Sequence, residues 1–457
     1  MVGPDYVRPS VEQPDGFKSQ ADREPAPAIT KEWWRLYSDP ELDQLIATAL
    51  ASNQTLRQAV ARVDEARALA RVAASFLYPT ISTNPSFART RYSANRDSTL
   101  TGRRVQQGVT VNDWLIPFDL AYEVDVWGRV RRSFESAKAQ AAATADDAGA
   151  VRLTVETDVA QFYYTLRSLD AQLQILTENV AAYREQVRIL SVQVKTGLAS
   201  AIVVNQAQAQ LQATLAQQRD VERARANLEH ALAILSGRPA PSFAIAANPL
   251  HESAPPVVPP GLPAQLLTRR PDVTAAEQAV VATNAQIGVA VAEFYPRFML
   301  TSSAGFESAN LASLFSWQSR VASISPSISL PIFQGGRLRA NLTATKARYE
   351  QAVAAYVNQV LIAYGDVEDA LTDLRALTDE VGSLREAVNA SRSYLRLADV
   401  QYKQGLTDYL IVIDAERTLL ANQLSLALAV NLQMGGSIRL IKALGGGWAP
   451  AEDRASR

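Results

Sequence analysis

The sequence contains no cysteine and only two histidines, His230 and His251. The absence of cysteine excludes disulfides, thiolate nucleophiles and zinc-thiolate sites. Neither histidine has a second ligand at helical spacing nearby, and no activated nucleophile or phosphate-binding glycine loop stands out. We therefore expect no enzyme activity, no catalytic residue, no cofactor and no bound metal.

An excess of charge of one sign is also lacking, as is any long apolar run. Lysine and arginine number 45 against 46 acidic residues, a net charge of -1. A nucleic-acid partner is not expected, because phosphate binding requires a basic surface. No run of about 18 consecutive apolar residues occurs, so no membrane-spanning helix is expected. If the chain crosses a membrane, it must cross as strands.

What the sequence does contain is a tandem internal repeat. The segment 128–131 (GRVR) recurs as 336–339 (GRLR), a separation of 208 residues, and the same shift aligns 195–198 with 403–406. Upstream, residues 76–79 match residues 293–296, a separation of 217 residues. Because the separation falls from 217 to 208 between the two matches, the first half must contain a longer loop, between Pro79 and Gly128. The chain is therefore predicted to be a duplication of one structural unit.

Each half is predicted to begin with an alanine-rich helix, at about 40–76 and about 273–294, followed by a much longer helix. From Gly128 to Lys195 such a helix would reach roughly 100 Å at 1.5 Å per residue. Apolar residues recur along it at heptad positions, among them Val159, Phe162, Leu166, Leu169, Leu173 and Leu176. A sustained seven-residue repeat predicts coiled-coil-like packing against neighbouring helices.

Between the helices, four segments alternate apolar and polar residues, at about 80–90, 112–126, 297–307 and 321–333. The clearest has apolar residues at every second position, namely Trp114, Ile116, Phe118, Leu120, Tyr122, Val124 and Val126. This pattern fits membrane β-strands, and it also fits half-buried strands of a soluble sheet. Four strands cannot close a barrel, and a sheet in lipid cannot leave free edges. Several copies must then combine their strands, and two, three or four copies all remain possible.

Four stretches carry motifs in the same order as a known family: residues 2–9 (VGPDYVRP), 33–42 (WWRLYSDPEL), 269–296 (RRPDV to FYP) and 331–337 (PIFQGGR). In them the chain resembles the TolC-like outer-membrane factors, especially the lipoprotein branch that serves resistance-nodulation-division efflux systems. The resemblance implies a mostly α fold with a small transmembrane β part. It implies a trimeric α-barrel and a shared β-barrel of twelve strands, four from each chain.

The repeat and the resemblance together predict a division into five parts. These are an N-terminal equatorial segment (1–39), the first repeat (40–237), an equatorial linker (238–262), the second repeat (263–445) and a C-terminal tail (446–457).

The resemblance also implies a function, that of a passive, gated exit duct for drugs or other small toxic compounds. The expected assembly is a homotrimer in the bacterial outer membrane that contacts outer-membrane lipid and extends into the periplasm. Its expected partners are a periplasmic adaptor protein and an inner-membrane resistance-nodulation-division transporter. Relatives carry a lipidated cysteine just before the motif that starts here at Val2, so a lipid anchor is expected in the native precursor.

Two alternatives to drug efflux stay open at this point. An outer-membrane factor of type I protein secretion or of metal export would share almost every feature. A soluble coiled-coil scaffold, from a different class, would explain the heptads alone.

Two glycine turns are predicted to end the long helices. Gly197 and Gly405 are suited to a left-handed helix end. Because they lie far from the strands along the helices, they are expected at the periplasmic tips. With Leu198 and Leu406 they are the expected docking points for the adaptor.

The expected gate follows the second turn. Leu410, Asp414 and Arg417 are three or four residues apart, on one helix face. By resemblance, rings of Leu410 and Asp414 narrow the entrance, while Tyr402 and Arg417 match residues that bond between helices to keep it shut. An apolar ring obstructs hydrated ions and a carboxylate ring prefers cations. Many relatives carry an acidic residue where this chain has Val203, so a latch bond to that position is not expected.

Overall fold

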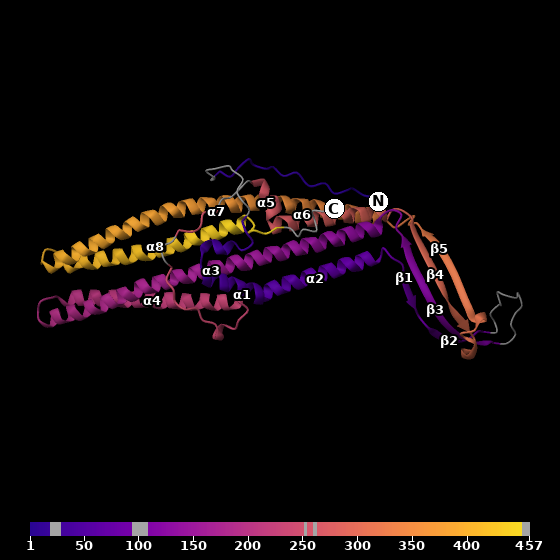
Figure 1. The fold of residues 1–457 in the computed structure, drawn as a ribbon, viewed down its shortest axis with the longest axis horizontal. Helices are drawn as coiled ribbons and strands as arrows, with labels where there is room; N and C mark the ends of the chain where they lie inside the picture. The colour runs from indigo at the N-terminus through magenta and orange to yellow at the C-terminus, as the bar shows by residue number, and fades with distance from the viewer. Residues whose placement is uncertain (19–28, 94–107, 251–253, 259–262, 450–457) are drawn as a thin grey trace. The chain divides into compact units, whose positions relative to one another are not determined.

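The computed structural model describes residues 1–18, 29–93, 108–250, 254–258 and 263–449 (Figure 1). The chain divides into two compact units. The sheet unit comprises residues 1–9, 63–144 and 276–355, and the helical unit comprises residues 10–62, 145–275 and 356–457.

The helices repeat with the spacing predicted from the sequence. Helices α3 (Arg129–Lys195) and α7 (Arg337–Lys403) have 67 residues each, and α4 (Ala201–Leu235) and α8 (Tyr409–Ala443) have 35 each. Both pairs are related by the 208-residue shift. Helices α2 (Gln54–Ser75) and α6 (Pro271–Ala292) have 22 residues each and follow the 217-residue shift. The predicted tandem repeat is confirmed.

The first predicted helix, at about 40–76, is wrong as a single element. Asn53 separates α1 (Pro40–Ser52) from α2 and has an extended backbone, with ψ 125°. Its side-chain oxygen accepts a hydrogen bond from the Leu56 amide at 2.9 Å, and its amide nitrogen donates to the Leu235 carbonyl at 2.9 Å. One asparagine thus caps a new helix and binds the end of α4. In the second half the corresponding break lies between α5 (Pro263–Arg269) and α6.

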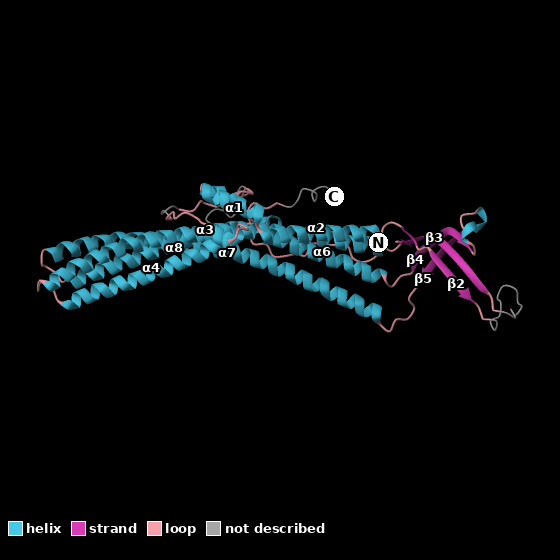
Figure 2. Cartoon of the chain, turned by 90° about the horizontal axis from the view of Figure 1, so that it is seen from below, coloured by secondary structure: helices cyan, strands magenta, loops and turns pink. Residues whose placement is uncertain are grey.

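The strands form one antiparallel sheet, drawn in magenta in Figure 2. Its members are β1 (Thr80–Thr83), β2 (Ser86–Arg91), β3 (Thr110–Val124), β4 (Arg297–Ser308) and β5 (Arg320–Ser329). The order is β1-β3-β4-β5, and β2 also pairs with β3, so β1 and β2 share one position. The strand predicted at 80–90 is divided where the register places Asn84 and Pro85 opposite Pro117 and Ile116 of β3. Two prolines meet at this point, and neither has an amide to donate to the ladder. Likewise β5 ends before Pro331, short of the predicted end near residue 333.

The register separates an apolar face from a polar face. The apolar face carries Trp114, Ile116, Phe118, Leu120 and Tyr122 of β3, Phe298, Leu300 and Phe306 of β4, and Ile324 and Ile328 of β5. The polar face carries Asp113, Asp119 and Glu123 of β3, Thr301, Ser303 and Glu307 of β4, and Ser323, Ser325 and Ser327 of β5.

The core of the helical unit joins α1, α3 and α8. Trp33, Leu42 and Leu166 are fully buried in it. Contrary to the expectation from the sequence, one helix among the described residues, α8, is long and apolar enough to cross a membrane, because its apolar residues are interrupted by only a few polar ones. In the structure 67% of that apolar window is buried, as in a core helix.

Gly237 and Gly445, which are related by the 208-residue shift, occupy equivalent positions. Their φ angles are +64° and +91°. A Cβ on Gly237 would lie 2.3 Å from the carbonyl oxygen of Ser52, the last residue of α1. A Cβ on Gly445 would lie 2.1 Å from that of Arg269, the last residue of α5. In both repeats, glycine lets the end of a 35-residue helix approach the end of a shorter one.

We expect Gly445→Ala to lower the free energy of unfolding by about 1–3 kcal/mol, because the added methyl group overlaps backbone. Gly382 in α7 is the matched control, since a Cβ there meets nothing within 4 Å. Gly382→Ala should stabilise the helix by about 0.5–1 kcal/mol. Thermal unfolding followed by circular dichroism should give shifts of opposite sign, and shifts of the same sign would contradict this packing.

Candidate functional site

The two predicted tips are glycine turns with matching geometry. Gly197 has φ +73° and Gly405 has φ +74°, and each turn is closed by hydrogen bonds typical of a left-handed helix end. The next residues, Leu198 and Leu406, are 80% and 72% exposed. Each hairpin therefore ends in an apolar side chain that no other described part of the chain covers.

Behind the turns, an apolar cluster joins all four long helices. It contains Leu190 of α3, Ala207 of α4, Ala398 of α7, and Tyr409, Val412 and Ala415 of α8. Val203 packs against this cluster, as does Tyr402, whose ring lies 5.2 Å from that of Tyr409. Position 203 is thus a packing position in this chain, which fits the absence of a carboxylate there.

Leu410, Asp414 and Arg417 lie on the opposite, exposed face of α8. The structure brings these three together and places Tyr402 on the packed side. Asp414 accepts a hydrogen bond from the Tyr394 hydroxyl at 3.1 Å. The Arg417 guanidinium forms no hydrogen bond or ion pair with any described residue, so the described part of the chain offers it no latch partner. Tyr394 was not predicted, because no local pattern relates it to a residue on the next helix.

Glu416 is a second carboxylate at the tip, and it points inward. It accepts a hydrogen bond from the side-chain amide of Gln186, so it joins α8 to α3. It also borders a cavity of about 360 Å³ with Arg392, Arg396 and Asp399 of α7. Burial raises the pKa of Glu416 to about 7, opposed in part by the Gln186 bond and increased slightly by the Asp399 charge.

The raised pKa makes packing at the tip pH-dependent. The pKa of Glu416 is about 7 in the packed state, against an ordinary value of 4.5. Between these two pH values, Glu416 holds a proton when the tip is packed and releases it when the tip unpacks. Stability from this group is full below about pH 4.5 and is lost as the pH rises towards 7, by on the order of 3 kcal/mol. We expect channel openings in planar bilayers to be more frequent at pH 7.5 than at pH 5, and Glu416→Gln to abolish the difference. The same pH dependence in that variant would exclude Glu416 as its origin.

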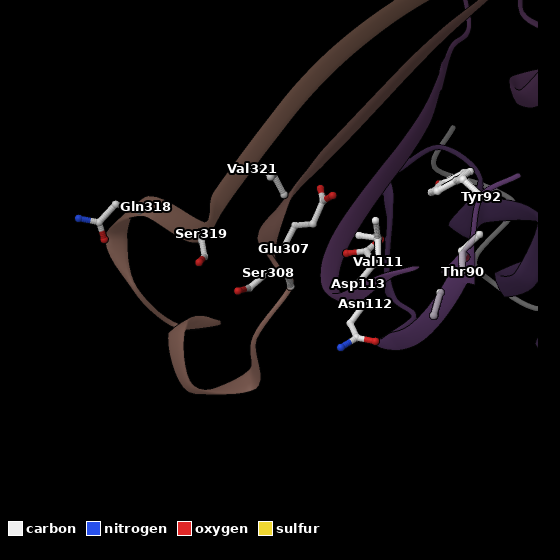
Figure 3. Close-up of a pocket in the computed structure, with 12 residues that line it drawn as sticks. Thr90, Tyr92, Val111, Asn112, Asp113, Glu307, Ser308, Gln318, Ser319 and Val321 are labelled. Atoms are coloured by element: carbon white, nitrogen blue, oxygen red, sulfur yellow. The ribbon is translucent and has the colours of Figure 1, made fainter. Parts of the chain in front are cut away.

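In the sheet unit, the polar face borders a cavity of about 570 Å³ (Figure 3). Asp113 of β3 and Glu307 of β4 line it from neighbouring strands. Among the described residues, Glu123 has an ion-pair partner, Arg129 at 2.7 Å, whereas Asp113, Asp119 and Glu307 have none. A surface of this charge favours cations in a water-filled passage.

A buried ionic network in the helical unit centres on Asp170, whose side chain is 1% exposed. Asp170 pairs with Arg167 at 3.0 Å and with Arg225 at 2.6 Å, and it accepts the Asn248 amide at 3.0 Å. Arg167 also donates to the Ala246 carbonyl at 2.7 Å. The network therefore fixes the start of the segment that follows the first repeat to α3 and α4.

The described residues form two long helical hairpins and one sheet. The sheet has one apolar face, one acidic face and two unpaired edges. This combination defines a subunit of a membrane channel. The sequence pattern of the outer membrane efflux protein family matches residues 45–238 and 262–446. The chain belongs to this family.

Relatives along the whole chain agree. The chain is 33% identical to the solvent efflux pump outer membrane protein SrpC of Pseudomonas putida, and the match covers 98% of this chain and 96% of SrpC. It is 31% identical to the outer membrane protein OprJ of Pseudomonas aeruginosa, over 98% and 93%. The structure of the outer-membrane channel OprN superposes with a TM-score of 0.90 at 30% identity, over 98% and 99% of the two chains.

These comparisons confirm the predicted family, the TolC-like fold and the function of an outer-membrane efflux channel that extends into the periplasm. The relatives are channel proteins and not enzymes. A soluble coiled-coil scaffold does not fit a chain of this family.

Proposed function

We propose that three copies of this chain form one conduit, with a shared barrel of twelve strands and a helical tunnel. The observation that carries the proposal is the open sheet: four strand positions, with β1 and β2 at one edge and β5 at the other. Neither edge can stay unpaired in lipid. Pairing β5 of one copy with β1 and β2 of the next satisfies both edges. The equatorial segments proposed at 1–39, 238–262 and 446–457 would surround the tunnel, and the Asp170 network supports this for the linker.

The gate is placed at the α7–α8 tip. Leu410 is 52% exposed and Asp414 lies one turn further on the same face, so three copies would present an apolar ring and a carboxylate ring to one passage. Tyr394 holds the Asp414 carboxylate. Tyr402 and Arg417 bond between helices to keep the entrance shut, and Arg417, which has no partner among the described residues, would bond to a neighbouring copy. The exposed Leu198 and Leu406 dock a periplasmic adaptor, which connects the duct to an inner-membrane resistance-nodulation-division transporter.

The cargo we propose is small, apolar toxic compounds, since the relatives are named for efflux of solvent, toluene and antibiotics. The test is a strain that lacks its own duct, complemented with this chain and challenged with toluene and a panel of antibiotics. Restored tolerance is expected. A matched variant with Leu198→Asp and Leu406→Asp should reach the outer membrane and still fail, because the adaptor cannot dock. Normal outer-membrane levels of the unchanged chain without restored tolerance to any compound would overturn the proposal.

A further inference from the structure

The sheet has one end joined to helices and one end that is not. Residues Thr80, Val124, Arg297 and Ser329 lie at the joined end, next to α2, α3, α6 and α7 in the chain. The opposite, distal end holds the last residues of β2 and β4 and the first residues of β3 and β5. Since the helices of this outer-membrane channel extend into the periplasm, the distal end lies in the outer leaflet.

Three arginines lie on the apolar face at the distal end. Phe87 pairs with Trp114, so Arg89 and Arg91, two and four residues further along β2, share the face of that aromatic pair. Arg320 of β5 pairs with Phe306 and lies on the same face. All three side chains are exposed, and none forms an ion pair with a described residue.

The carboxylates of the strands lie on the other side of the sheet. Asp113, Asp119, Glu123 and Glu307 all belong to the polar face. The two faces therefore carry opposite charges, and the arginines have no acidic neighbour on their own face among the described strand residues. A guanidinium is costly at the middle of a bilayer and nearly neutral at its interface, so this arrangement fits arginines at the headgroup level.

Aromatic side chains mark the same level. The rings of Phe87 and Trp114 are 4.3 Å apart, and those of Phe306 and Phe315 are 5.5 Å apart. Trp317 is 77% exposed, and the Arg320 guanidinium lies over its ring. Aromatic residues gather where a barrel passes from hydrocarbon to headgroups.

We propose that Arg89, Arg91 and Arg320 bind the phosphate groups of phosphorylated glycolipid in the outer leaflet. Arginine is suited to this, because its planar fork donates two hydrogen bonds to one phosphate. The inference rests on the proposed trimer in one respect: pairing of the β5 and β1/β2 edges brings Arg320 of one copy to the seam beside Arg89 and Arg91 of the next.

The test uses the full-length trimer in phosphatidylcholine vesicles that contain phosphorylated lipid A, with the lipid A retained per chain after extraction measured by native mass spectrometry. Each arginine should contribute about fivefold. The triple variant Arg89→Gln, Arg91→Gln, Arg320→Gln should therefore retain lipid A on the order of a hundredfold less. Arg297→Gln, a polar-face change at the joined end, should retain it normally. The triple lysine variant should keep part of the binding.

Three results would overturn the proposal: unchanged retention in the triple glutamine variant, equal retention of dephosphorylated lipid A, or displacement by inorganic phosphate, which would indicate a simple anion site. Trimer formation and conductance are measured on the same samples. A triple variant that still forms conducting trimers but loses lipid A supports the lipid site, whereas an unchanged chain that forms no trimer counts against the proposed channel assembly.

Discussion

Asp170→Ala is expected to lower the free energy of unfolding of the helical unit by about 3–5 kcal/mol, the usual result of removing one partner from a buried ion pair. Asp170 is 1% exposed, and Arg167 beside it is 3% exposed. The substitution removes the acceptor that two guanidinium groups and the Asn248 amide share. Arg167 keeps only Glu41, at 2.6 Å, and Arg225 keeps only Glu229, at 3.3 Å, as an ion-pair partner among the described residues. Thermal unfolding followed by circular dichroism should register the loss, and chymotrypsin should cleave the 238–262 linker, which contains Phe243, faster.

The chain provides a matched control for this prediction. Asp220 pairs with Arg223 at 3.2 Å on the surface of α4, with both side chains more than 70% exposed. Asp220→Ala should change stability by at most about 1 kcal/mol, because solvent screens an exposed pair. Equal shifts for the two variants would show that the buried network does not stabilise the linker.

The long elements of the fold could be predicted because their signals are local and repeated. The bounds of α3 and α7 follow from motifs such as GRVR and from heptads that continue for many turns. The break at Asn53 was missed because alanine-rich sequence on both sides favours one continuous helix. Its cause is tertiary, since the Asn53 side chain binds the carbonyl of Leu235 at the end of another helix. The divided strand at Pro85 had a local signal, which the apolar alternation outweighed.

The candidate site shows the same limit. The shared face of Leu410, Asp414 and Arg417 follows from helical spacing alone. By contrast, Gln186 and Glu416 are 230 residues apart, and only the packing of α3 against α8 brings them together. Tyr394 is near Asp414 because the hairpin folds back at Gly405. Contacts between helices decide which polar groups meet at the tip, and a single sequence does not specify them.

At the proposed gate, Asp414→Ala is expected to raise single-channel conductance on the order of a few-fold and to weaken cation preference. In three copies the substitution would remove three carboxylates from one constriction. Their loss removes negative charge and also widens the narrowest part of the passage. The variant also loses the Tyr394 contact between α7 and α8. Conductance and reversal potential in planar bilayers with a salt gradient measure both effects. Asp379→Ala, which removes an exposed carboxylate from α7, should change neither.

Asp414→Asn separates the two causes, because it keeps the side-chain volume and the contact with Tyr394 while it removes the charge. We expect cation preference to fall as far as in the alanine variant, with a much smaller rise in conductance. Tyr394→Phe should do the reverse: it leaves the carboxylate charged but untethered, so preference persists while openings become more frequent. If alanine at position 414 leaves conductance and preference unchanged, the constriction lies elsewhere and this face of α8 is an ordinary solvated surface.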